Sequence, residues 1–110
     1  MAQFFEIPLS TGAQSFSINL GGNQYEMRLI YRNAVGGGWF LDMRRADGSD
    51  AVLGVPLVTE TDLLGQVEHK GFGHLLARLD SGAGGKPTYA DMGTSLHLYW
   101  SAESWNQFSG

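Results

Sequence analysis

The side chains that could bind a metal or exchange protons near neutral pH are those of three histidines, His69, His74 and His97. No two of them have the H-x-x-x-H spacing that places two imidazoles on one helix face for zinc. Isolated histidines in a chain of 110 residues are more often surface residues or satisfied core residues. We therefore expect no metal site, and an enzyme that uses these histidines is the weakest of the functional alternatives.

The other motifs that could carry chemistry are incomplete. Residues 47–50 (DGSD) are similar to part of a calcium loop but lack its glutamate and spacing, so a hairpin turn is expected. No serine lies in a G-x-S-x-G elbow, and neither glycine run, 36–38 or 82–85, is followed by Lys-Ser/Thr and a helix as in phosphate-binding loops. Asp42 interrupts an apolar run, but one carboxylate does not form an acid/base pair. The sequence thus predicts a protein without catalytic residues, cofactors or metal ligands, and not an enzyme.

The composition favours a folded domain and leaves much neutral surface available for contact with other proteins. Hydrophobic residues make up 43% of the chain and charged residues only 16%, whereas disordered chains have few hydrophobic and many charged residues. A net charge of −4 argues against nucleic acid as a partner, because phosphate binding relies on lysine and arginine. There is no cysteine, no basic signal sequence at the start and no apolar run near the ~18 residues of a membrane helix. We expect synthesis in a reducing cytoplasm and no membrane partner.

Alternation of apolar and polar residues predicts an all-β fold. The clearest strand is 14–20, where Phe16, Ile18 and Leu20 alternate with polar residues. Glycines separate the apolar runs and are expected to form turns. Together these signals predict a single small antiparallel barrel or sandwich of about six to eight short strands. The other expected strands are residues 4–9, 24–32, 39–45, 51–58, 71–80 and 94–100.

Residues 1–110 are expected to form one β domain, because a chain of this length has room for one hydrophobic core. At most one short helical turn is expected, near Asp62–Leu64, where residues 59–62 (TETD) offer N-cap side chains. The C-terminal tail, about residues 101–110, carries Trp105 and Phe108 among polar residues. Such a tail is mobile unless it docks, so we expect it to be extended or to contact a partner.

Several of these segments together resemble the plug domain of cyanophage contractile-tail baseplates, a family that occurs in tailed phages and prophages. The resemblance covers the first two thirds of the chain. It is carried by residues 5–9 (FEIPL), 14–20 (QSFSINL), 25–33 (YEMRLIYRN), 39–43 (WFLDM), 54–58 (GVPLV) and 62–64 (DLL). The residues taken as its signature are Tyr25, Trp39, Leu41, Asp42, Gly54, Pro56 and Asp62.

The resemblance implies a structural protein of the virion tail baseplate that closes the lumen of the tail tube and hub. Implied partners are hub, tube, tape-measure or spike proteins, with a homo-oligomer also possible. The chain departs from the family in the insertion around Gly36 and Gly37 and after Gly65. We therefore expect partner contacts at Gly36, Gly37, Trp105 and Phe108. The alternative of a different class is a carbohydrate- or ligand-binding β module, which the tryptophans and loops of the sequence also suit.

Overall fold

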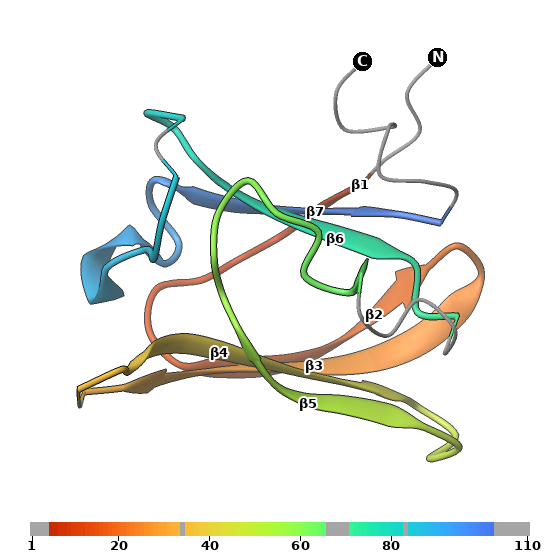
Figure 1. The fold of residues 1–110 in the computed structure, drawn as a ribbon. Helices are drawn as coiled ribbons and strands as arrows, with labels where there is room; N and C mark the ends of the chain where they lie inside the picture. Colours follow the sequence, from red (N-terminus) through yellow and green to blue (C-terminus); the bar gives the residue numbers. More distant parts are fainter. Residues whose placement is uncertain (1–4, 34, 66–70, 83, 103–110) are drawn as a thin grey trace.

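The computed structural model describes residues 5–33, 35–65, 71–82 and 84–102. Within these residues the chain forms seven strands in two antiparallel sheets that face each other as a sandwich (Figure 1). The all-β prediction is confirmed, and of the two architectures left open by the sequence the chain adopts the sandwich and not a closed barrel. The strands are β1 (Phe5–Ile7), β2 (Gln14–Leu20), β3 (Asn23–Arg32), β4 (Gly38–Arg45), β5 (Ala51–Pro56), β6 (His74–Leu79) and β7 (Leu96–Ser101).

The four-stranded sheet has the order β2-β3-β4-β5, so each strand pairs with its neighbour in the sequence. The turn between β2 and β3 consists of Gly21 and Gly22, whose φ angles of 60° and 87° are the left-handed values of a tight hairpin turn. This turn fixes the register, in which Phe16 lies opposite Met27. The pleat then places one set of side chains in the core and the other in solvent, as the alternation predicts.

The three-stranded sheet has the order β1-β7-β6 and covers the inner face of the larger sheet. Its inward side chains include Leu75 and Leu98, which are completely buried. Trp100 belongs to this core, and its indole N–H donates a hydrogen bond of 2.7 Å to the carbonyl oxygen of Phe72. Both sheets contribute to one continuous cluster of buried hydrophobic residues.

The expected strand 51–58 ends earlier than its apolar sequence suggests. The Leu57 N–H still bonds to the carbonyl of Trp39, but Thr59 pairs with Gly85 and Asp62 pairs with Leu76 in isolated bridges. The chain therefore leaves the four-stranded sheet after Pro56 and crosses to the edge of β6. A continuous apolar run was consistent with one strand, and only the packing of two sheets shows where it divides.

The chain turns where the sequence predicts a short helical turn, and a 3-10 helix also lies further along. Asp62 forms a bridge, Leu63 and Leu64 form a turn and Gly65 has 3-10 structure, while η2 (Tyr89–Asp91) is a separate 3-10 helix. The Asp91 carboxylate accepts hydrogen bonds from the main-chain N–H and the hydroxyl of Thr88, at 2.7 and 3.0 Å. This segment follows a run of glycines and a proline, and no helix is predicted there from the sequence. No helix in the described ranges is long and apolar enough to cross a membrane.

Candidate interaction surfaces

Three of the signature residues are core residues. Tyr25, Trp39 and Leu41 point inward from β3 and β4 and are each at most 1% exposed. The indole N–H of Trp39 donates a 3.0 Å hydrogen bond to the carbonyl oxygen of Thr88, which attaches the segment before η2 to the four-stranded sheet. These side chains fill and connect the sandwich and are not available to a partner.

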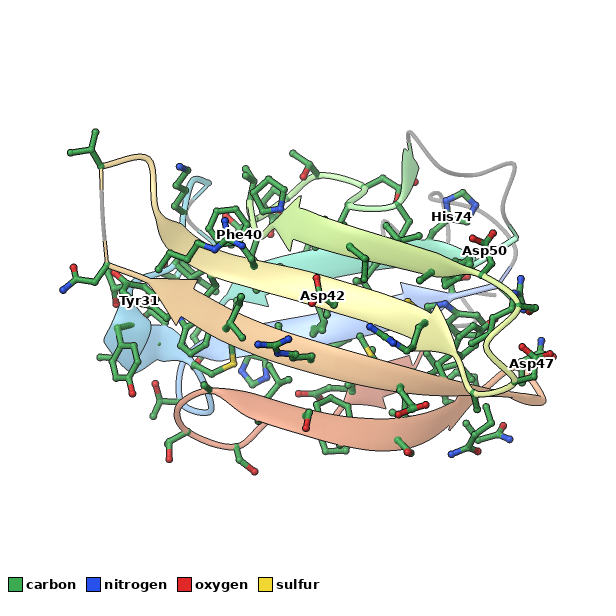
Figure 2. The ribbon with its side chains drawn as sticks, turned by 90° about the horizontal axis from the view of Figure 1, so that it is seen from below. Tyr31, Phe40, Asp42, Asp47, Asp50 and His74 are labelled. Carbon is green, nitrogen blue, oxygen red and sulfur yellow. The ribbon has the colours of Figure 1, made fainter. Side chains whose placement is uncertain are left out.

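Asp42, Gly54 and Pro56 meet at an irregularity of the β4–β5 pairing. The register shifts between Leu41 and Met43, and Gly54 adopts a left-handed φ of 70°. The Gly54 N–H donates a 2.7 Å hydrogen bond to a carboxylate oxygen of Asp42 on the outer face of the sheet (Figure 2). Asp42 thus satisfies the main chain at a β-bulge, which explains why a carboxylate interrupts an apolar strand.

Asp62 holds the crossing segment on β6. One carboxylate oxygen lies 2.7 Å from Nδ1 of His74, and the other accepts main-chain hydrogen bonds from Leu64 and Leu75 at 3.2 and 3.3 Å. His74 is largely buried at this contact. These contacts attach the segment that crosses between the two sheets to β6. His74 is thereby paired with a carboxylate and not with another described histidine.

His97 lies on the outer face of the three-stranded sheet between two carboxylates. Its Nδ1 is 2.7 Å from Glu6 of β1, and its Nε2 is 2.7 Å from Asp80, which follows β6. The hydrogen bond with Glu6, followed by that with Asp80, raises the pKa of His97 above its ordinary value near 6.5. A protonated imidazole can donate to both acids at once, so this group connects three segments of the chain.

The histidines do not form a metal centre within the described part of the chain. His74 contacts Asp62 and His97 contacts Glu6 and Asp80, so the two histidines lie in separate groups, and His69 lies outside the described residues. Among the residues described, no group of three or more histidine, cysteine, aspartate and glutamate side chains is arranged to hold a metal ion. The turn prediction for residues 47–50 is confirmed, because Asp47 accepts a 2.9 Å hydrogen bond from the N–H of Ser49 within the β4–β5 turn.

One end of the sandwich carries an aromatic cluster. The rings of Trp39 and Tyr89 are stacked, with centroids 5.5 Å apart and an interplanar angle of 12°. Tyr31 packs edge-on against both, with its ring centroid 5.3 Å from that of Trp39 and 5.1 Å from that of Tyr89. Tyr89 is 54% exposed, whereas Trp39 is buried. Tyr89 is not among the contact residues expected from the sequence, because its place in a glycine-rich, polar segment gives no strand or helix pattern.

The β3–β4 turn lies at the same end as η2 (Figure 1). It contains Gly36, which has no neighbouring atom where a side chain would stand, and Gly37, whose carbonyl oxygen accepts a 3.4 Å hydrogen bond from Lys86. Val35 in this turn is fully exposed. We call the surface formed by Tyr31, Val35, Gly36, Gly37 and Tyr89 the aromatic end. The other two expected contact residues, Trp105 and Phe108, lie outside the described residues.

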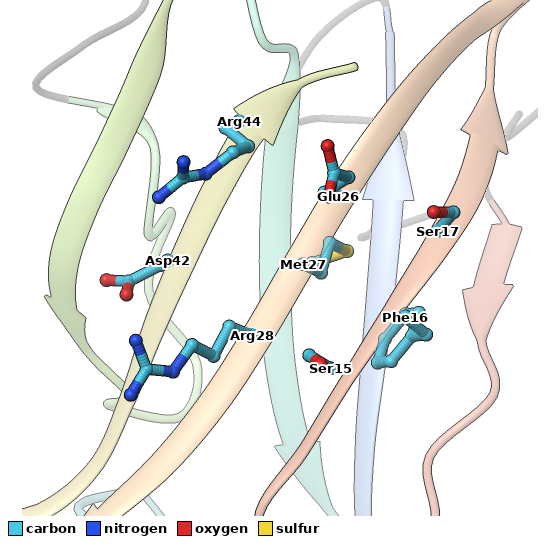
Figure 3. A pocket seen from close by; sticks show the side chains of 8 residues that line it. All are labelled: Ser15, Phe16, Ser17, Glu26, Met27, Arg28, Asp42 and Arg44. Carbon is cyan, nitrogen blue, oxygen red and sulfur yellow. The ribbon is translucent and has the colours of Figure 1, made fainter. Parts of the chain in front are cut away.

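The outer face of the four-stranded sheet carries an ordered set of charges. Glu26 lies opposite Arg44 and Arg28 opposite Asp42 across the β3–β4 pair, which places opposite charges next to each other. With Ser15 and Ser17 of β2 these side chains line a hollow of about 370 Å³ (Figure 3). The face is polar and open, so it suits contact with another polar surface better than it suits an enclosed small molecule.

The tryptophans do not support a sugar-binding platform in the described part of the chain. Trp39 and Trp100 are buried at 1% and 3% exposure, so neither offers an open ring face. The ligand-binding alternative depended on exposed aromatic rings and loops. Of the described rings in the aromatic cluster, only Tyr89 is mostly exposed, and its indole neighbour covers one side.

Comparison with known families gives a direct result. The family described as "Cyanophage baseplate Pam3 plug gp18" matches residues 4–103 of the 110-residue chain. A search of curated proteins found no match. The matched range includes both sheets and continues well beyond the first two thirds of the chain, in which the resemblance was noted. The chain therefore belongs to the cyanophage baseplate plug family.

Proposed function

We propose that this protein closes the lumen of a phage tail tube and hub, through contacts with other baseplate proteins and without catalysis. The supporting observation is the family match over residues 4–103, which makes it a baseplate structural component. A plug acts by shape and by many modest contacts that can be released when the surrounding proteins rearrange. A sandwich with one continuous core suits that role, because it resists deformation while its loops contact neighbours.

The aromatic end is the surface proposed for the main contact with a hub, tube, tape-measure or spike protein. Tyr89 is an exposed tyrosine supported from behind by a buried tryptophan, and a rigid aromatic side chain is a common interface anchor. Val35 adds exposed apolar surface, and Gly36 allows close approach of a partner's main chain. Trp105 and Phe108 are proposed to contribute further contacts from the tail.

Virion composition and binding test this proposal. Purified virions are expected to contain the protein, and a reconstruction of the baseplate should lose density on the tail axis when its gene is deleted. Tyr89→Ala should weaken binding to the hub or tube protein of the same phage by roughly tenfold or more, as for an aromatic hot spot. Leu53→Ala is the matched control, since Leu53 is exposed to a similar extent but lies on β5 away from the aromatic end.

Two results would contradict the proposal. Absence of the protein from purified virions would exclude a role as a tail plug. Equal binding by wild type, Tyr89→Ala and Leu53→Ala would show that the aromatic end is not the contact surface, while leaving membership of the baseplate intact.

A further inference from the structure

Strand β2 is an open edge of the four-stranded sheet. It pairs with β3 on one side, and in the described part of the chain no main-chain hydrogen bond joins it to a segment on the other side. Leu20 and Asn23 flank a two-residue turn and so form a hydrogen-bonded pair, and bonded pairs then alternate along the hairpin. The N–H and C=O groups of Ser15, Ser17 and Asn19 therefore point away from β3, toward the open side.

The opposite edge of the same sheet is protected, and β2 is not. On β5, Gly54 breaks the regular backbone, its N–H bonds to Asp42, and Pro56 has no N–H to offer. Bulges, prolines and charged side chains are the devices by which proteins block pairing at an edge. Strand β2 contains no proline, glycine or charged residue over its seven positions. Figure 2 shows β2 as the outermost strand on its side of the sheet, with no described strand beyond it.

The side chains next to this edge are incompletely covered. Phe16 and Ile18 point toward the core but remain half-buried, whereas Leu20 on the same strand and Met27 on the next are buried. A hollow of about 360 Å³ lies beside them and is lined by Pro8, Ser10 and β2 itself. An added strand with apolar residues on its inner face would cover this gap.

We propose that the partner at this edge is a second copy of the chain, paired antiparallel through β2 about a two-fold axis at Ser17. In this register Ser17 of each copy faces Ser17 of the other, and Ser15 faces Asn19 of the second copy. All three outward residues are then used, with two hydrogen bonds for each bonded pair and about six in total. Phe16 lies opposite Ile18 of the second copy on the inner face, so apolar side chains meet apolar ones.

The chemistry of β2 favours its own copy over a charged partner strand. A two-fold interface presents the same strand to itself, so a charge near the axis would lie close to the same charge of the second copy and would oppose pairing. Every residue of Gln14–Leu20 is uncharged, and its alternation matches itself when reversed. This inference does not depend on the proposed role in the baseplate, because it concerns the isolated chain.

Substitution of Ser17 separates pairing from folding. The Ser17 side chain is exposed and lies opposite Glu26 within the chain, so Ser17→Lys should be tolerated by the monomer. In the proposed dimer two lysines would face each other directly, which should weaken dimerisation roughly tenfold or more. Sedimentation velocity over a concentration series is expected to show dimer for the wild type and monomer for Ser17→Lys, with unchanged circular dichroism.

Charge reversal and a matched edge variant complete the test. An equimolar mixture of Ser17→Lys and Ser17→Glu should restore the dimer mass, because opposite charges then meet across the axis. Leu53→Lys places the same charge at an exposed site on the other edge strand and should leave the dimer intact. Amide exchange at Ser15, Ser17 and Asn19 should be slow in concentrated wild type and fast in Ser17→Lys.

The proposal fails if the wild type is monomeric throughout the concentration series. It also fails if dimerisation is unaffected by Ser17→Lys, or if the assembly is a trimer or larger ring, since a two-fold β2 pair cannot extend into one. Protection of the three amides that requires a different tail protein would show that the edge receives a strand from that protein instead of a second copy.

Discussion

At the scale of single residues, His97 connects two carboxylates that lie far apart in the chain. It connects Glu6 near the start of the described chain with Asp80, and its ring stacks against Tyr99 at 6.3 Å. Arg78 lies opposite His97 in the β6–β7 register but is paired with Glu60 through two hydrogen bonds of 2.8 and 2.9 Å. The positive partner of the two acids at this point is therefore the imidazolium.

Stability should depend on pH through His97. The pKa of His97 is raised in the folded state, so its contribution is complete below the unfolded value near 6.5 and is lost as the pH rises through the folded pKa. The difference in melting temperature between wild type and His97→Gln should accordingly be larger at pH 5.5 to 6 than at pH 8.5, roughly the two sides of a histidine titration. A difference that stays constant over this range would contradict the assignment.

Asp42 permits a second test at the residue scale. Asp42→Ala removes the acceptor for the Gly54 N–H and should lower the free energy of unfolding by about 1 kcal/mol, the usual effect of one hydrogen bond. Asp42→Asn keeps an oxygen that can accept this hydrogen bond, so its free energy of unfolding should fall by less. Urea denaturation measures both variants, and equal losses would show that the carboxylate charge, not the hydrogen bond to the bulge, is the important property.

At the scale of elements, close contacts between loops determine how the two sheets are joined at their ends. Gly93, between η2 and β7, has a φ of 78°, and a side chain there would lie 2.6 Å from main-chain atoms of Ser10 and Thr11. The β1–β2 loop and the segment after η2 are therefore in direct main-chain contact. Neither loop shows this contact in its own sequence, because each reads simply as a turn.

Substitution of Gly93 should disrupt that contact. Gly82 has nearly the same φ, 75°, but no atom within 4 Å of the added carbon, so Gly82→Ala measures the backbone cost alone. In both variants the left-handed backbone should lower the free energy of unfolding by about 1–2 kcal/mol. In Gly93→Ala overpacking should lower it by a further amount of about 1–3 kcal/mol. Equal midpoints in urea denaturation would show that the Ser10–Thr11 segment moves away without cost.

At the scale of the whole molecule, the surfaces with distinct chemistry lie on different sides of the sandwich. The aromatic end is at one end, the charged face covers the outside of the four-stranded sheet, and the open β2 edge lies along one side (Figures 1 and 2). The two proposed contacts therefore use different parts of the surface. The tests of the aromatic end and of the β2 pairing accordingly use different variants.

Local pattern predicted much of the fold. The strand expected at residues 14–20 is β2 as observed, and the two-glycine turn fixed its pairing with β3, because alternation and turn geometry are properties of neighbouring residues. The resemblance to baseplate plugs likewise came from the spacing of residues in these strands, and the family match confirms it. The structural role of each signature residue was not predictable from the pattern. The signature includes core residues such as Trp39 and also Asp42, whose side chain accepts a main-chain hydrogen bond.

The sequence by itself determined that the chain is all-β, which side chains of each clear hairpin face inward, and to which family it belongs. Only the tertiary structure decided that the apolar run after Ala51 divides between two sheets, that Tyr89 stacks on Trp39, and that His97 joins Glu6 to Asp80. Glu6 and His97 are 91 positions apart in the chain. Contacts of this kind depend on how the two sheets stack and which loops then meet, and no period in the sequence encodes that arrangement.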